Sequence, residues 1–454
     1  MKKIQSINPY TKELNAEFEL LNESEILEKI EIANNSFKNW KNTSNSQKKK
    51  LFTKLSEILL ENKEELAKLN VIEMGMTYKN ALADVSKSAS GIMWFVNNFE
   101  EILQDKQFSE GGITGIITYE PLGVLYSVAP WNFPYNQVFR NAIPNILAGN
   151  VVLNKHASNV PFVAKKIEEL FLQSGFPDGV FTNLFISPSD SDLIINHPFV
   201  RGANITGGET AGRHIGALAG KKLIPSILEL GGNDPFLVLD NNDLDRIVND
   251  AVSARLGNCG QKCNSAKRFI VLEKYYEDFC DRFTKKMQEV KVGDPMDDKN
   301  TMGPLAKTSL IDEIEKQISD SIEKGAILLT GGKATHREKN LFPPTVLKDV
   351  VPGMKVFDEE VFGPVAPIIK AIDIDEAIKF ANNSKFGLGC SLYGDDIEQL
   401  REVSKKIEAG NVYINKIVTS YPFLPYGGIK DSGYGKELAE NGLKNFVNEK
   451  VIVE

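Results

Sequence analysis

Strands and helices alternate along most of this chain, and that alternation restricts the fold more than any other sequence feature. After residue 123, short aliphatic and β-branched runs such as 151–153 are followed by segments such as 160–173, which carry apolar residues at helical spacing. A second series of the same kind begins near Pro235 and continues to about residue 415. Alternation of this kind is typical of parallel sheets with helical crossovers. We therefore predict an α/β protein with two layered units.

The two ends of the chain follow different patterns. Residues 24–89 contain few helix breakers and predict two or three long amphipathic helices. Around Gly111, glycines alternate with β-branched residues, which predicts a β-hairpin leading into a buried strand. The final segment, 444–454, is an alternating strand whose edge needs a cover. Pairing with the early hairpin or with another subunit would provide it.

Composition and charge exclude several classes of protein. The 454 residues give room for two or three domains, and the net charge of -8 repels nucleic acid phosphates and anionic lipids. No apolar stretch follows the N-terminal lysines, and no run of 18 apolar residues occurs anywhere. Four cysteines are too few for a disulfide framework. We expect a cytoplasmic protein without a nucleic acid or membrane partner.

Cys263 is the first candidate catalytic residue. It follows Gly260 and Gln261 just before a predicted strand, so a sharp turn would present its thiol to a cleft. Such a cysteine can act as a nucleophile if its pKa is lowered, and the alternative is an inert buried cysteine. Three residues separate Cys259 from Cys263, and no histidine has ligand-like spacing with them, so zinc is a poor alternative and we predict no metal. A regulatory disulfide between Cys259 and Cys263 is an open alternative.

Two further residues have side chains suited to acyl chemistry. Glu229 precedes a Gly-Gly pair and is flanked by leucines, which predicts a desolvated carboxyl with a raised pKa, useful as a general base. The alternative is a solvated carboxylate that caps a turn. Asn132 lies in a rigid turn between Pro130 and Pro134 and offers an amide donor of the oxyanion-hole type. Its alternative is ordinary hydrogen bonding to local backbone.

Two segments resemble nucleotide sites. Lys155 lies at the carboxyl end of a short strand, the edge where open α/β sheets bind ligands. Gly207 and Gly208 form a turn between a strand and a helix, where backbone amides can meet a phosphate. The G-x-G-x-x-G pattern is absent. The run 207–212 imitates a P-loop without its Lys-Ser/Thr ending, so a nucleoside triphosphatase is not favoured.

These stretches, taken in order, resemble the aldehyde dehydrogenase superfamily. The motifs are WNFP, the Lys155 strand, the Gly207 turn, ELGG, GQ-x-C, EEVFGPV and PYGGIKDSGYGKE. The resemblance implies a Rossmann-type cofactor domain, an α/β catalytic domain and a small bridging β-sheet, assembled as a homodimer or homotetramer. The implied ranges are 1–107 and 123–228 for the cofactor domain, 229–413 for the catalytic domain, and 108–122 and 414–454 for the bridging segments.

The resemblance also implies a role for each motif residue. Cys263 would attack the aldehyde to form a thiohemiacetal and then a thioester, Asn132 would hold the oxyanion, and Glu229 would activate the hydrolytic water. Lys155 would bind the adenosine ribose or its 2′-phosphate. The remaining implied cofactor residues are Trp131, Gly207, Gly208, Glu360 and Phe362, which would lie along the pyrophosphate, the nicotinamide ribose and the nicotinamide ring.

Within the superfamily, the chain is most similar to short bacterial succinate-semialdehyde dehydrogenases. Arg140 matches an arginine that grips the substrate carboxylate in that group, whereas the second arginine, expected six residues before the nucleophile, is replaced by Gly257. Arg255 is displaced by two positions. Many NAD-preferring members have Glu where this chain has Ser158, so NADP as well as NAD is expected. The alternatives are a CoA-acylating dehydrogenase and a catalytically silent cofactor-binding protein.

Overall fold

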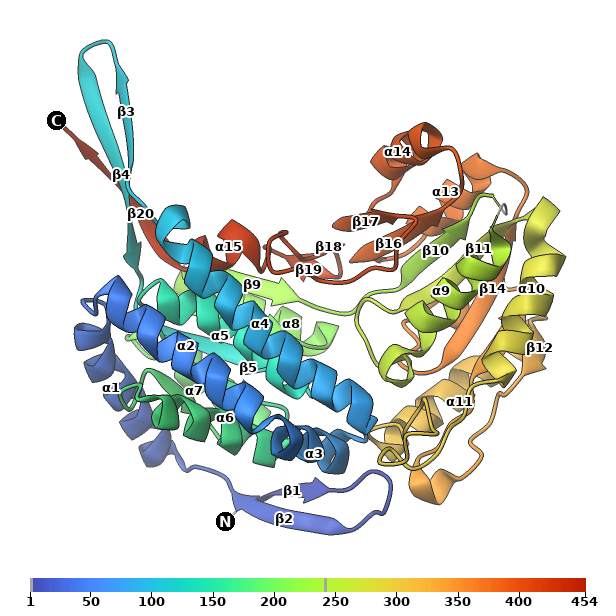
Figure 1. Cartoon of the computed structure of the whole chain (residues 1–454), viewed down its shortest axis with the longest axis horizontal. Coiled ribbons are helices and arrows are strands. Elements are labelled where there is room, and N and C mark those ends of the chain that lie inside the picture. The colour runs from blue at the N-terminus through green and yellow to red at the C-terminus, as the bar shows by residue number, and fades with distance from the viewer. Residues whose placement is uncertain (1–2, 241–242) are drawn as a thin grey trace.

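The computed structural model describes residues 3–240 and 243–454, and most of its strands lie in two large sheets (Figure 1). The first sheet has the strand order β19-β9-β8-β5-β6-β7, and the second has the order β12-β13-β14-β11-β10-β16-β17. All neighbouring strands run parallel except for one antiparallel edge strand in each sheet, β19 and β12. The predicted parallel α/β architecture is confirmed.

The first sheet carries the residues that the sequence assigns to the cofactor. Its strands are β5 (Val124–Ala129), β6 (Val151–His156), β7 (Phe181–Asn183), β8 (Val200–Thr206), β9 (Ser226–Glu229) and β19 (Gly433–Tyr434). Its crossover helices are α5 (Pro134–Leu147), α6 (Pro161–Ser174), α7 (Ser191–Asn196) and α8 (Glu209–Lys222). Every residue of β6 is buried, as expected for a strand covered on both faces.

The second sheet is built from later parts of the chain. Its strands are β10 (Asp234–Val238), β11 (Ala266–Leu272), β12 (Ile327–Thr330), β13 (Thr345–Lys348), β14 (Val365–Ala371), β16 (Gly389–Tyr393) and β17 (Asn411–Ile414). Its helices are α9 (Leu244–Leu256), α10 (Glu273–Gln288), α11 (Thr308–Glu323), α12 (Lys355–Asp358), α13 (Ile374–Asn382) and α14 (Ile397–Lys406). Two short strands, β15 (Phe386–Gly387) and β18 (Ile429–Lys430), pair antiparallel beside it.

The N-terminal region differs from the prediction in its number of helices. After a hairpin of β1 (Lys3–Ile7) and β2 (Leu14–Glu19), the chain forms α1 (Glu23–Trp40), α2 (Asn45–Glu61), α3 (Lys63–Met74) and α4 (Tyr78–Ile102). Four helices replace the two or three expected. Asn62 ends α2, and Gly75 ends α3 with a left-handed φ of 77° that glycine tolerates. The longest of these helices, α4, later supplies a residue to the site.

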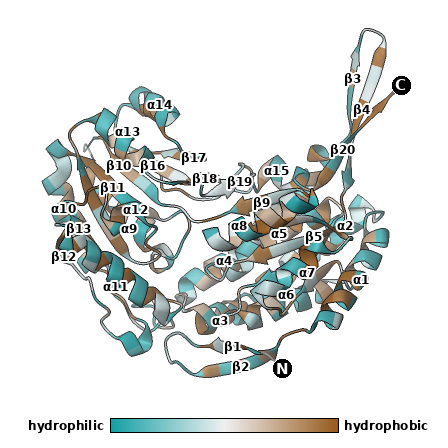
Figure 2. Cartoon of the chain, turned by 180° about the vertical axis from the view of Figure 1, so that it is seen from behind, coloured by the Kyte–Doolittle hydropathy of each residue, from teal (hydrophilic) through white to brown (hydrophobic). Residues whose placement is uncertain are grey.

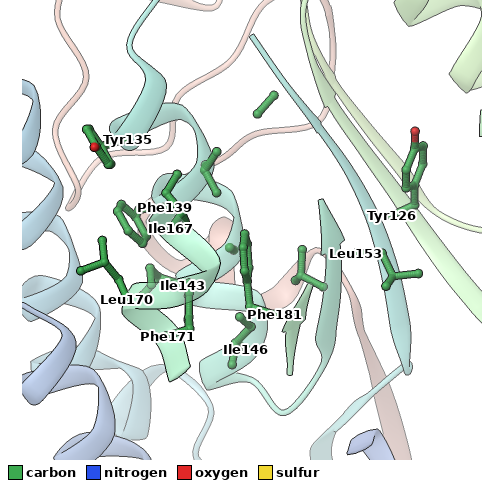
Figure 3. Packing of buried hydrophobic residues seen from close by; sticks show 14 of the residues in the cluster. Tyr126, Tyr135, Phe139, Ile143, Ile146, Leu153, Ile167, Leu170, Phe171 and Phe181 are labelled. Atoms are coloured by element: carbon green, nitrogen blue, oxygen red, sulfur yellow. The ribbon is translucent and has the colours of Figure 1, made fainter. Parts of the chain in front are cut away.

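The core of the first unit holds its sheet and helices in register. In Figure 3, Phe139 and Ile143 of α5 and Ile167 of α6 point into the same buried cluster as Leu153 of β6. Phe171 stacks on Phe181 with ring centroids 4.5 Å apart. Burying each such side chain contributes roughly 1.5–3 kcal/mol. This packing fixes the carboxyl ends of β5, β6 and β8, from which the site is built.

A narrow arm projects from the body of the molecule (Figure 1). It consists of β3 (Lys106–Glu110), β4 (Ile113–Pro121) and β20 (Val447–Val453), which follows α15 (Ala439–Lys444). The final strand pairs antiparallel with β4, so one of the two predicted covers for its edge is confirmed. Figure 2 shows apolar residues on this arm, and Phe108, Ile113 and Val453 are 59%, 61% and 65% exposed.

Candidate active site

One cavity of about 400 Å³ collects the predicted catalytic and cofactor residues. Since the carboxyl ends of parallel strands meet at one edge of a sheet, the residues that follow β5, β6 and β8 lie together there. The predicted residues that line the cavity are Trp131, Asn132, Lys155, Ser158, Gly207, Gly208, Glu229, Cys263, Glu360 and Phe362. A second cavity of about 230 Å³ contains Arg140 and shares Asn132 and Cys263 with the first. Cys263 therefore lies where the two cavities meet.

Glu229 is the last residue of β9, and its side chain is 1% exposed. Burial raises the pKa of its carboxyl to about 7, while Arg140 and the nearby Cys263 thiol lower it and Glu437 raises it. The prediction of a desolvated carboxyl with a raised pKa is confirmed, and the alternative of a solvated carboxylate is wrong. A carboxyl with this pKa changes its protonation state near neutral pH and can serve as a base there.

The turn that carries Cys263 is sharply constrained. Asn258, Cys259 and Gly260 all have positive φ, at 51°, 58° and 73°. A Cβ on Gly260 would lie 2.3 Å from the carbonyl oxygen of Gly363, so only glycine fits there. On the far side of the turn, Lys267 Nζ donates hydrogen bonds to the carbonyl oxygen of Cys263 at 2.6 Å and to that of Lys262 at 2.9 Å. The nucleophile candidate is thus held by its backbone.

The environment of Cys263 favours the protonated thiol over the thiolate. Burial raises its pKa well above the usual value, and the neighbouring Glu229 carboxylate raises it further, whereas Lys267 and Arg140 lower it. A thiol in this environment needs a proton acceptor before it can attack. The Glu229 carboxyl, which lines the same cavity and influences the pKa of the thiol, is the candidate acceptor.

Asn132 is tied to the same turn. Its side-chain Nδ2 donates to the backbone carbonyl oxygen of Gln261 at 3.0 Å. Its backbone carbonyl oxygen accepts a hydrogen bond from Asn258 Nδ2 at 2.7 Å. Because an amide nitrogen carries two hydrogens, one N–H of Asn132 is left for a ligand in the shared part of the two cavities. Local backbone bonding and an oxyanion-hole role are therefore compatible.

The 400 Å³ cavity has the features that a dinucleotide requires at its phosphate end. Gly208 precedes α8 and provides no side-chain cap, and, apart from its chain neighbours, no heavy atom of the described residues lies within 4 Å of the position that a Cβ on Gly208 would take. The amides at the start of that helix can therefore reach a phosphate. Lys155 Nζ donates one hydrogen bond, to the carbonyl oxygen of His156 at 3.3 Å. Its remaining N–H groups can serve a ribose or a phosphate, and Ser158 lies beside it.

The other end of this cavity suits a nicotinamide ribose and ring. Trp131 and Phe362 meet edge to face with ring centroids 5.7 Å apart. Glu360 forms an ion pair with Lys267 at 3.0 Å and accepts a hydrogen bond from the Gly232 amide at 3.2 Å. The residues present therefore fit an NAD(P) molecule, and Cys263 lines the same cavity.

Arg140 has a partner that the sequence did not suggest. Its guanidinium forms a buried ion pair with Glu437 at 2.7 Å and lies over the ring of Tyr426. Arg255, the displaced arginine, is fully buried and donates to the backbone carbonyls of Ala266 and Val361, so it does not line either cavity. Arg255 therefore does not replace the arginine that was expected at position 257.

Two residues of this site were missed at the level of sequence. Glu437 lies within the last quoted motif, and Lys267 lies four residues after the nucleophile, yet neither carries a pattern that identifies its partner. The disulfide alternative is not seen: Cys259 and Cys263 are both free, and the Cys259 thiol donates to the carbonyl oxygen of Gly303 at 3.4 Å.

Comparison with known proteins gives a consistent result. Residues 1–452 match the aldehyde dehydrogenase family. The chain is 40% identical over 452 residues to a protein of Mycobacterium tuberculosis named succinate-semialdehyde dehydrogenase [NADP(+)] 1, with 99% of each chain covered. It is 36% identical to succinic semialdehyde dehydrogenase from Streptococcus pyogenes, whose crystal structure contains NADP+, with a TM-score of 0.97 and 99% of each chain covered.

Proposed function

The chain belongs to the aldehyde dehydrogenase family, and on this premise we propose that it oxidises succinate semialdehyde to succinate with NADP+, and with NAD+ as a second oxidant. The observation that carries the proposal is the position of Cys263 between two cavities, one suited to a dinucleotide and one lined by cations. Both relatives described above carry this substrate in their names, and both are associated with NADP.

In the proposed first half-reaction, Glu229 takes the proton of the Cys263 thiol, and the sulfur forms a bond to the aldehyde carbon. The free N–H of Asn132 and the backbone amide of Cys263 stabilise the resulting oxyanion. A bound NADP+ supplies the hydride acceptor. The product of this half-reaction is a thioester on Cys263.

Before the second half-reaction, Glu229 releases to solvent the proton that it took from the thiol. It then removes a proton from water, which attacks the thioester carbon. The carbon–sulfur bond breaks, and Cys263 leaves as the thiolate with the carboxylic acid released. The buried carboxyl with a pKa of about 7 supports this role, since it is deprotonated in about half of the molecules at neutral pH. The same residue speaks against the CoA-acylating alternative, which needs no base for water.

A steady-state assay of an aldehyde panel with NAD+ and NADP+, with and without CoA, tests this function. We expect CoA-independent oxidation, with the highest kcat/KM for succinate semialdehyde. Strict CoA dependence would favour the acylating alternative, and the absence of any turnover would favour the silent cofactor-binding alternative.

Ser158→Glu is expected to lower the ratio of kcat/KM for NADP+ over NAD+ by at least about tenfold, roughly 1.4 kcal/mol. The serine lies beside Lys155 in the cofactor cavity and is neutral, whereas a carboxylate there would repel a 2′-phosphate and accept the ribose hydroxyls. Ser158→Ala serves as the size-matched neutral control. An unchanged ratio in Ser158→Glu would contradict this assignment.

We also propose a cytoplasmic homodimer or homotetramer that associates through the arm. The four free cysteines are compatible with a reducing compartment, and in the described part of the chain no helix has the length and hydropathy needed to cross a membrane. The proposed domains follow the sheets except for β19, which pairs in the first sheet although it lies in the C-terminal segment. Residues 1–107 and 123–228 bind the cofactor, and residues 229–413 carry the nucleophile, with 1–2 and 241–242 outside the described residues. Residues 108–122 and 414–454 bridge subunits.

Replacing both Val451 and Val453 with Asp is expected to shift the protein to the monomer. These side chains are 63% and 65% exposed on β20, and an apolar strand edge of this kind is normally covered by a partner. Molar mass by light scattering checks the outcome, with Glu449→Ala on the same strand as control. An unchanged mass would mean that the arm does not hold the subunits together.

A further inference from the structure

The 230 Å³ cavity beside Cys263 contains more positive charge than Arg140 alone provides. Lys87 of α4 and Lys262, the residue before the nucleophile, also line it. Arg140 is already paired with Glu437, while its Nε has no hydrogen-bond partner within residues 3–240 and 243–454. Among the residues that the structure describes, no carboxylate forms an ion pair with Lys87 or Lys262.

The one carboxylate that lines this cavity is used elsewhere. Asp84 accepts hydrogen bonds from Asn70 Nδ2 at 2.9 Å and from the amide of Tyr135 at 3.2 Å, at the start of α5. It therefore caps a helix, while Lys87 and Lys262 line the cavity. Lys87 donates to the hydroxyl of Ser420 at 3.1 Å. Burial, and then the charges of Arg140 and Lys262, lower the pKa of Lys87 to about 8, whereas Asp84 raises it.

The position of Lys262 relates directly to the missing arginine. A Cβ placed on Gly257 would lie 3.5 Å from Lys262 Cδ and 3.7 Å from its Nζ. The lysine ammonium therefore lies against the backbone of residue 257, six residues before the nucleophile, where an arginine was expected. Since glycine has no side chain, the space is left to Lys262.

We propose that Lys262 and Lys87, together with the Ser420 hydroxyl, bind the distal carboxylate of the aldehyde substrate, and that Lys262 supplies the charge absent at Gly257. The inference rests on the proposed function and names the residues that select its substrate. Two ammonium groups and a hydroxyl provide several donors to the two carboxylate oxygens. Arg140 lines the same cavity as the two lysines, pairs with Glu437 and lowers the pKa of Glu229.

The test compares succinate semialdehyde with butanal, which has the same chain length and no carboxylate. We expect Lys262→Met to lower the ratio of kcat/KM for succinate semialdehyde over butanal at least about tenfold, mainly through a higher KM for succinate semialdehyde. Lys262→Arg should keep the ratio within about threefold of the wild type. Lys68→Met, on the exposed face of α3, is the matched control for loss of one positive charge.

An exchange variant makes the test specific. In Gly257→Arg combined with Lys262→Ser, the added Cβ has room once the lysine is removed, and we expect the ratio to recover to within about fivefold of the wild type. NADPH binding, followed by fluorescence, verifies folding of each variant. If Lys262→Met does not fold, Lys87→Met provides the same comparison from a different helix.

The outcomes separate the two proposals. A wild-type enzyme that prefers butanal overturns the substrate assignment and the lysine site together. A wild-type preference for succinate semialdehyde that Lys262→Met retains overturns the lysine site alone.

Discussion

Cys263→Ala is expected to reduce aldehyde oxidation by roughly four orders of magnitude or more, because no other residue can form the covalent bond to the aldehyde carbon. Asn132 and Glu229 remain in place in this variant, yet they can only orient an aldehyde that has no nucleophile. Stopped-flow and steady-state measurement of NADPH formation would show neither a burst nor turnover.

Cofactor binding should survive this substitution. The cofactor cavity is formed mainly by Trp131, Lys155, the Gly207–Gly208 turn and Phe362, and the Cys263 side chain is a small part of its wall. Fluorescence titration with NADPH should therefore give a Kd within about threefold of the wild type. Cys259→Ala, which removes a buried thiol four residues away, is the matched control and should keep most activity. Turnover near the wild-type rate in Cys263→Ala would disprove the mechanism.

Glu229→Gln is expected to separate the two half-reactions. The amide cannot accept a proton from water, so hydrolysis of the thioester should slow by about 10²–10⁴-fold. Thioester formation should continue, with solvent or hydroxide taking the thiol proton more slowly. Rapid mixing should then show a burst of NADPH about equal to the concentration of active sites, followed by slow turnover. Loss of the burst as well as the turnover would restrict Glu229 to the activation of Cys263.

The pH dependence of the wild type follows from the same residue. Below a pKa of about 7 the Glu229 carboxyl is protonated and cannot accept a proton, so the rate of hydrolysis should rise as the pH passes upward through about 7 and then level off. Glu229→Gln should lack this rise. Glu398→Gln, an exposed position on α14, should keep it and serves as the control.

Local patterns in the sequence were sufficient for the alternating strands and helices of the two α/β units. A buried parallel strand is apolar on both faces, and a helix has a 3.6-residue period, so β6 and α6 can be recognised from a few residues each. Parallel topology then explains why the residues that follow β5, β6 and β8 meet at one edge. It does not explain the meeting of Glu229 with Cys263, because Glu229 ends β9 of the first sheet and Cys263 lies just before β11 of the second.

Pairings between distant segments could be read only in part. The pairing of β4 with the last strand of the chain was one of two alternatives, whereas the pairing of β19 with β9 through Gly433 and Glu229 was not predicted. The helix count in the N-terminal region was also wrong, because one residue such as Asn62 can end a helix without interrupting the apolar pattern.

The sequence by itself determined the fold class and the family and predicted the candidate reacting residues, since each depends on short segments whose chemistry is local. Only the tertiary structure decided how the charges are distributed around Cys263. Arg140 forms an ion pair with Glu437, and Arg255 donates hydrogen bonds to backbone carbonyls. Lys262 lies against the backbone of Gly257. A charge acts through space over a few ångströms and falls with distance, so its effect depends on which segments the fold brings together and not on their order in the chain.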